Sequence, residues 1–292
     1  MYNGIICVPK VKIARGNCSN EEEEQMWKWQ AEGQANGVIV LVHSAYEHHK
    51  RYSWQIEEWK KAGFHVVMRD LAGHGSGRTT KKAHLTDFAI YEQEIDEMVR
   101  TAMAEELPVF IVAHGFGAML AISYLSSAKP PVAGVVFTSP WLQLKKTPSK
   151  AAGALSGLHK LMGSLKVDHG LTVHDLTRNP DTIEALEEDA LYRPVVTIKW
   201  YRELQHYMKQ IAAGKIRLPD IPLYVHTGGN DIVTDKEAPK IWLKNQSLNE
   251  FAFKEWKHAS HDLFQEPERE DVLIASHFFM KNVLRSLGYA VK

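Results

Sequence analysis

The sequence predicts an α/β protein: a mainly parallel sheet flanked by helices, with a helical cap inserted late in the chain. Short runs rich in β-branched residues alternate with amphipathic stretches, the order expected of strands joined by crossover helices. The runs are hydrophobic at nearly every position, which indicates strands covered on both faces. A long stretch with helical patterns and no strand signal then interrupts the alternation.

Five apolar runs carry the strand prediction. They span residues 37–42, 64–68, 108–112, 132–137 and 222–226. Amphipathic stretches at 52–62, 87–105 and 117–127 are the predicted helices between them. The interruption covers residues 141–218, so we expect a core made of residues 1–140 and 219–292 and a cap made of 141–218.

The composition excludes several classes of partner. Lys plus Arg and Asp plus Glu are equal at 35 each, so no overall field favours nucleic acid or an anionic membrane.

Cys7 and Cys18 lack the spacing of a metal site and are expected to be free thiols. Because no secretory signal pattern is present at the start, we expect a cytoplasmic location.

Residues 107–128 carry no Asp, Glu, Lys or Arg and are long enough to span a bilayer. His114, Gly115 and Gly117 interrupt them with a turn, which favours a buried strand, turn and helix instead. We therefore expect no transmembrane segment.

The turn within this stretch has the layout of a nucleophile elbow. Ala113-His114-Gly115-Phe116-Gly117 follows a predicted strand and matches G-x-S-x-G, with alanine for the first glycine and Gly115 in the serine position. Asp231 and His261 follow later strands, the second of them the run FAFKEW. The chain order is therefore nucleophile position, acid, histidine, as in α/β sheets that cleave esters.

These motifs resemble the bacterial lysophospholipase and monoacylglycerol lipase-like branch of the α/β-hydrolases, also called serine aminopeptidase-like. The resemblance runs from about residue 26 to about 284. It is carried by HSAYEHHKRY at 43–52, DLAGHGSG at 70–77, WYREL at 200–204 and HDLFQEPERE at 261–270.

The resemblance implies a role for each site residue. Asp231 would orient the imidazole, His261 would act as general base and then general acid, and the Ala45 and Phe116 N–H groups would form the oxyanion hole. It implies hydrolysis of carboxylic esters of lipid-like substrates, with no cofactor and no metal. His43, Glu47, His48 and Arg51, which could suggest a metal cluster, are explained as polar residues that fix their loop.

Leu155, Leu158 and Met162 in the predicted cap could hold an acyl chain, although helix packing explains their apolar face equally well. The ligand class expected is a small lipid-like or ester molecule. The oligomeric state is left open.

The sequence departs from the family pattern at the predicted site. Gly115 has no side chain that could attack, Ser44 stands where the family usually has glycine, and Ala113 and Ala118 replace common glycines. Several neighbouring changes favour natural divergence over an engineered inactivation. Ser44 is disfavoured as a substitute nucleophile, because its loop normally turns backbone rather than side chain inward.

The expected protein is thus an impaired or inactive ester hydrolase. The alternatives are a non-catalytic protein that binds an apolar ligand or a partner, and an enzyme in which His261 activates water or another serine. We expect Asp231 and His261 to be hydrogen-bonded, and His261 to face an empty volume above Gly115.

Overall fold

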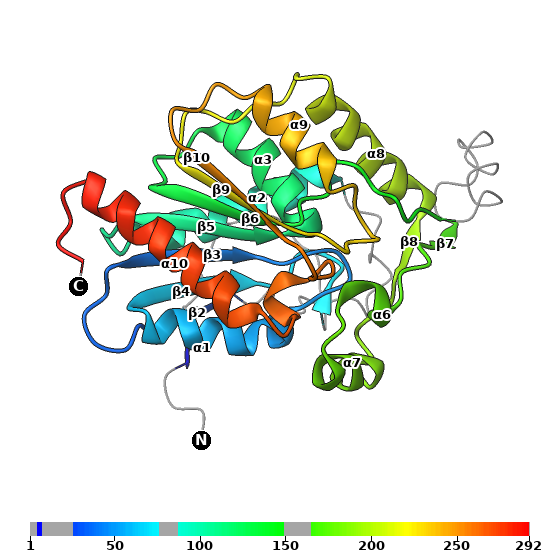
Figure 1. The fold of residues 1–292 in the computed structure, drawn as a ribbon, viewed down its shortest axis with the longest axis horizontal. Coiled ribbons are helices and arrows are strands. Elements are labelled where there is room, and N and C mark those ends of the chain that lie inside the picture. Colours follow the sequence, from blue (N-terminus) through cyan, green and yellow to red (C-terminus); the bar gives the residue numbers. More distant parts are fainter. Residues whose placement is uncertain (1–4, 8–25, 76–86, 149–164, 292) are drawn as a thin grey trace, which may run out of the picture.

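The computed structural model describes residues 5–7, 26–75, 87–148 and 165–291. Its centre is an eight-stranded sheet with the order β1-β2-β4-β3-β5-β6-β9-β10 (Figure 1). The strands are β1 (Ile5–Cys7), β2 (Met26–Trp29), β3 (Gly37–Val42), β4 (Phe64–Arg69), β5 (Val109–His114), β6 (Gly134–Thr138), β9 (Leu223–Gly228) and β10 (Phe251–Trp256). β2 runs antiparallel to β1 and β4, and the pairs from β4 to β10 are parallel. The predicted fold class is confirmed.

Helices cover both faces of the sheet (Figure 1). One face packs against α1 (Ser53–Lys61) and α10 (Arg269–Ser286), and the other against α2 (Phe88–Met103), α3 (Gly115–Ala128) and α9 (Glu237–Lys244), while α8 (Ile198–Ala212) packs on α3. Along β5, Ile111 and Ala113 belong to one apolar core, whereas Phe110 and Val112 belong to the other. This alternation explains why the run is hydrophobic throughout.

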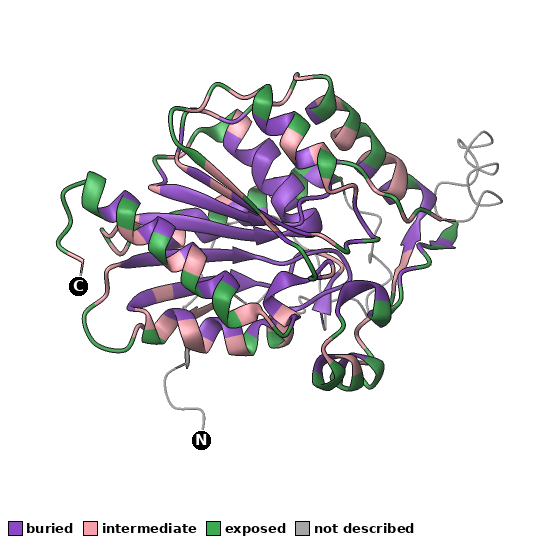
Figure 2. Cartoon of the chain, in the orientation of Figure 1, coloured by how far each residue is buried: buried purple, intermediate pink, exposed green. Residues whose placement is uncertain are grey.

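Burial is concentrated in the sheet and in α3 (Figure 2). Every residue of β3 and β5 is buried, and α3 is buried from Gly115 to Leu125. The segment 107–128 is therefore a strand followed by a helix, as predicted. No helix in the described parts of the chain is long and apolar enough to cross a membrane.

The stretch between β6 and β9 contains both helices and strands. It holds β7 (Lys166–Asp168), α6 (Val173–Leu176), α7 (Pro180–Glu187), β8 (Val195–Thr197) and α8. The prediction of helices alone was wrong, because β7 and β8 form a two-stranded antiparallel sheet. Strands of three residues are too short to produce a recognisable alternation in the sequence.

Candidate active site

The elbow forms where β5 ends at His114 and α3 begins at Gly115. Gly115 has φ +53°, in the left-handed region that residues with a side chain rarely adopt. A Cβ at this position would lie 2.2 Å from the Ser44 hydroxyl oxygen and 3.1 Å from Trp141 Nε1. The backbone keeps the shape of an elbow, but its neighbours leave no room for a side chain.

Ser44 lies at the carboxyl end of β3 with its hydroxyl turned into the site. Its Oγ accepts a hydrogen bond from the Phe116 N–H at 3.1 Å, and its own N–H donates to Glu47 Oε2 at 2.9 Å. The prediction that this loop turns only backbone inward was wrong for Ser44. One of the two N–H groups predicted for the oxyanion hole is consequently bonded to a serine of the same chain.

Ala45, which was predicted to supply the other N–H group, is buried in the same loop. The next residue, Tyr46, has φ +70°, which is strained for a residue with a bulky side chain. Its hydroxyl is hydrogen-bonded to His169 Nδ1 at 2.7 Å. The loop is therefore held in an unusual conformation by contacts from the segment after β6.

Asp231 and His261 lie within hydrogen-bond distance, as predicted. The distance from His261 Nδ1 to Asp231 Oδ2 is 2.8 Å, and both residues are buried. The loop after β9 holds the carboxylate, because Asp231 Oδ1 accepts the Val233 and Thr234 N–H groups at 2.7 and 3.0 Å. Oδ2 also accepts the Thr234 hydroxyl at 2.6 Å.

The two groups shift each other's pKa in opposite directions. Burial favours the neutral form of both side chains, yet the charge and hydrogen bond of the partner outweigh it. The pKa of Asp231 is held below its ordinary value and that of His261 above its ordinary value. The pair thus keeps the electrostatics of a base oriented by an acid.

Trp141 occupies the other side of the imidazole. Its indole Nε1–H donates to His261 Nε2 at 3.1 Å, and its backbone N–H donates to the Gly115 carbonyl at 3.0 Å. Because an indole N–H can only donate, Nε2 is the unprotonated nitrogen and Nδ1 carries the proton toward Asp231. This is the tautomer of a general base, but the lone pair that would take the proton is already bonded.

The prediction of an empty volume above Gly115 was therefore wrong. Ser44 and Trp141 fill that space, and both are buried, as is His261. Trp141 was not among the predicted site residues, although it lies in the turn after β6, three residues beyond Thr138. Its position at the carboxyl end of a parallel strand is the signal that marks it as a candidate.

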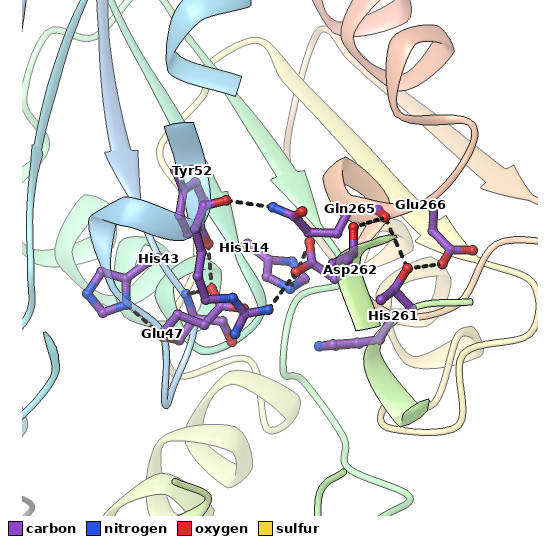
Figure 3. Close-up of polar contacts among 12 residues, drawn as sticks. His43, Glu47, Tyr52, His114, His261, Asp262, Gln265 and Glu266 are labelled. Carbon is purple, nitrogen blue, oxygen red and sulfur yellow. Dashed lines mark hydrogen bonds and ion pairs between the residues drawn. The ribbon is translucent and has the colours of Figure 1, made fainter. Parts of the chain in front are cut away.

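A buried polar cluster lies beside His261 (Figure 3). Arg51 is 3.2 Å from Glu47 and 3.3 Å from Asp262, and Tyr52 donates to Glu47 at 2.6 Å. Glu47, His114 and Asp262 place one ligand atom each within 4.8 Å of one another. Since Arg51 contacts both carboxylates, a guanidinium already supplies the cation that they need.

The pKa shifts in this cluster follow from burial and from Arg51. Burial opposes the charge of Glu47, but Arg51 and His114 lower its pKa to about 2. Burial and the charge of Glu47 raise the pKa of Asp262. Glu47 bonds both Ser44 and Tyr52, so its contacts are those of a residue that fixes the loop.

The predicted acyl-chain residues Leu155, Leu158 and Met162 lie outside the described residues. Nothing in the structure bears on that prediction.

The fold and the order of the site residues define an α/β-hydrolase. Residues 33–268 match the serine aminopeptidase family, S33, and the chain belongs to this family. It is 38% identical over 256 residues to phospholipase YtpA of Bacillus subtilis (strain 168), an alignment that covers 87% of this chain and 98% of that protein. The predicted resemblance is confirmed.

Two further comparisons agree. Monoacylglycerol lipase of Mycolicibacterium smegmatis is 24% identical over 252 residues, covering 84% of this chain and 88% of that protein. The crystal structure of Paleococcus ferrophilus monoacylglycerol lipase superimposes with a TM-score of 0.77 at 27% identity, covering 88% of this chain and 98% of that chain.

Proposed function

We propose that this chain is a non-hydrolysing member of the family, a pseudoenzyme whose catalytic centre has become a closed polar core. The observation that carries the proposal is the position of the Ser44 hydroxyl, 2.2 Å from where a Cβ on Gly115 would stand. The place of the nucleophile is filled from a different strand end, and the elbow itself has no group that could attack.

Acyl transfer needs a nucleophile, a base with a free lone pair, and N–H donors for the oxyanion. Gly115 supplies no nucleophile. The lone pair of His261 Nε2 accepts the Trp141 N–H, and the Phe116 N–H donates to Ser44. The base and one of the two predicted oxyanion donors are therefore satisfied by internal partners.

The proposal includes a small lipid-like ligand, which the names of the relatives support. Such a ligand would bind away from His261, because Ser44 and Trp141 occupy the space that an ester carbonyl would need. We retain residues 141–218 as a cap and the cytoplasm as the location. The cap is supported by the break in the strand pattern, and the location by the expectation that Cys7 and Cys18 are free thiols.

A second candidate function is ester hydrolysis with Ser44 as the nucleophile. Its hydroxyl lies close to the usual place of the attacking group, which favours this reading. The bond between Trp141 and His261 opposes it, because the indole would have to leave before the imidazole could take a proton from Ser44.

The test compares hydrolysis by the unaltered chain and by His261→Ala. Suitable substrates are p-nitrophenyl butyrate, a monoacylglycerol and lysophosphatidylcholine. Loss of a triad serine lowers turnover about a million-fold in a comparable hydrolase, so we expect near-background rates that do not differ between the two proteins. Hydrolysis that His261→Ala abolishes would contradict the proposal.

A further inference from the structure

A groove of about 430 Å³ lies on the surface beside α7, away from Gly115 and Trp141. We call it the α7 groove. It is bounded by the 3-10 turn His49–Tyr52, the start of α1, the first turns of α7 and the start of α10. Its volume is in the range of pockets that bind small molecules. The residues on which the argument rests are His48, Lys50, Trp54, Leu186 and Arg269.

Two cations face the groove without a carboxylate partner. Lys50 and Arg269 make no ion pair with any of the described residues, and Lys50 is exposed. The Arg269 guanidinium carbon lies 4.4 Å from the centre of the Trp54 ring. A guanidinium stacked on a ring keeps its N–H edges available for a carboxylate or phosphate.

Three helices open on the groove at their N-termini. Ser53 and Trp54 begin α1, Asn179 caps α7, and Arg269 begins α10, and all four residues line it. The unpaired N–H groups and the dipole of each helix add partial positive charge at that end. These contributions reinforce the two free cations.

His48 provides a nearly buried polar group at the edge of the groove. Its Nε2 is 2.8 Å from Asp189 Oδ2, whereas its Nδ1 has no hydrogen-bond partner within the described parts of the chain. The pKa of Asp189 is lowered, because the hydrogen bond from His48 outweighs the effect of burial. The Asp189 carboxylate is thus already hydrogen-bonded to His48. Asp181 is the other carboxylate that lines the groove.

The groove also has an apolar side. The Trp54 ring, Ala185 and the buried Leu186 line it next to the charged groups. A ligand that fits would combine an anionic end for Lys50 and Arg269 with a short apolar part for Trp54 and Leu186. We propose that the α7 groove binds a small amphiphile whose headgroup is a phosphate or a carboxylate.

The experiment measures binding of octyl phosphate, octanoate and the neutral octyl glucoside by isothermal titration calorimetry. We expect one or both anionic probes to bind, the tighter one identifying the headgroup, and octyl glucoside to bind at least tenfold more weakly. Arg269→Gln and Lys50→Gln should each weaken the anionic probe about tenfold, because each removes a charge-assisted contact.

Lys199→Gln is the matched control, since Lys199 is an exposed lysine on α8 that does not line the groove. The affinity of Lys199→Gln for the anionic probe should equal that of the unaltered chain. Lys50→Gln should leave thermal unfolding unchanged because Lys50 is exposed, and thermal unfolding of Arg269→Gln measures separately what the loss of its contact with Trp54 does to the fold. No binding of either anionic probe, or affinities that both variants leave unchanged, would overturn the proposal, and so would equal binding of octyl glucoside.

Discussion

The Ser44 hydroxyl oxygen lies 2.2 Å from the point where a Cβ on Gly115 would stand. The two positions therefore exclude each other as serines in this arrangement. The resemblance seen in the sequence implies glycine at the first position and serine at the second, and we propose that the two are reversed here. A hydroxyl occupies this space, but it comes from the end of β3 and not from the end of β5.

The reversal predicts a stability coupling between Ser44 and Gly115. Gly115→Ser should destabilise the fold by about 1–3 kcal/mol, because the new side chain overpacks the space that Ser44 fills. In a protein that already carries Ser44→Gly, Gly115→Ser should lower the free energy of unfolding by a smaller amount. Urea unfolding of the four proteins gives the double-mutant cycle, and additive effects would show that the two side chains do not compete.

The same pair of changes bears on activity. Gly115→Ser alone is expected to stay near background, since its hydroxyl would meet Ser44 and the Trp141 indole. Adding Ser44→Gly and Trp141→Phe to Gly115→Ser removes both obstacles and should give measurable ester turnover. Turnover by the single variant equal to that of the triple variant would contradict this expectation.

A prediction about His261 follows from its contact with Trp141. The indole N–H stabilises the neutral imidazole, so Trp141→Phe should raise the pKa of His261 further above its ordinary value. The pKa is measured by following the imidazole signals in an NMR titration. Trp242→Phe is the control, because this buried tryptophan makes no hydrogen bond through Nε1 with any described residue. If the pKa of His261 falls in Trp141→Phe, His261 Nε2 does not accept a hydrogen bond from the Trp141 indole as described.

The strands and the acid–histidine pair were predictable because their signals are local. A continuous apolar run such as residues 37–42 can bury itself only inside a sheet, and motif order places Asp231 and His261 after strands. Side-chain direction in a loop carries no such signal. Ser44 turns inward because the missing side chain at Gly115 leaves room, which is visible only when the ends of β3 and β5 are brought together.

Acid should destabilise the protein through His226. This histidine is fully buried, its Nδ1 accepts the Trp256 indole N–H at 3.1 Å, and burial lowers its pKa from 6.5 to about 3. The unfolded chain binds a proton here below about pH 6.5, whereas the folded chain does not until about pH 3. The free energy of unfolding should therefore fall with pH across this window, by up to about 1.4 kcal/mol per pH unit from this group.

His226→Gln should reduce the change in the free energy of unfolding per pH unit, whatever it does to the stability at neutral pH. Urea unfolding at several pH values between 7 and 4 measures this pH dependence, with the exposed His206→Gln as the control. An unchanged pH dependence in His226→Gln would mean that His226 is protonated in the folded state.

Arg51 should be essential to stability, because it contacts two buried carboxylates. Arg51→Met leaves Glu47 and Asp262 without their guanidinium and is expected to lower the free energy of unfolding by about 3–5 kcal/mol at neutral pH. Adding Glu47→Gln should restore part of that free energy, since it removes one of the two unpaired buried charges. If Glu47→Gln lowers the free energy of unfolding of Arg51→Met still further, the carboxylates are not the cause of the destabilisation.

Covalent labelling of the unaltered chain with a fluorophosphonate, read by intact mass and peptide mapping, tests most directly whether the site has lost its nucleophile. This reagent modifies a serine only when a neighbouring base activates it. With Gly115 at the elbow and the His261 lone pair bonded to Trp141, we expect no added mass, whereas the Ser44→Gly, Gly115→Ser, Trp141→Phe triple variant should be labelled at residue 115. Stoichiometric labelling of the unaltered chain at Ser44, lost in His261→Ala, would contradict this expectation and establish Ser44 as a working nucleophile.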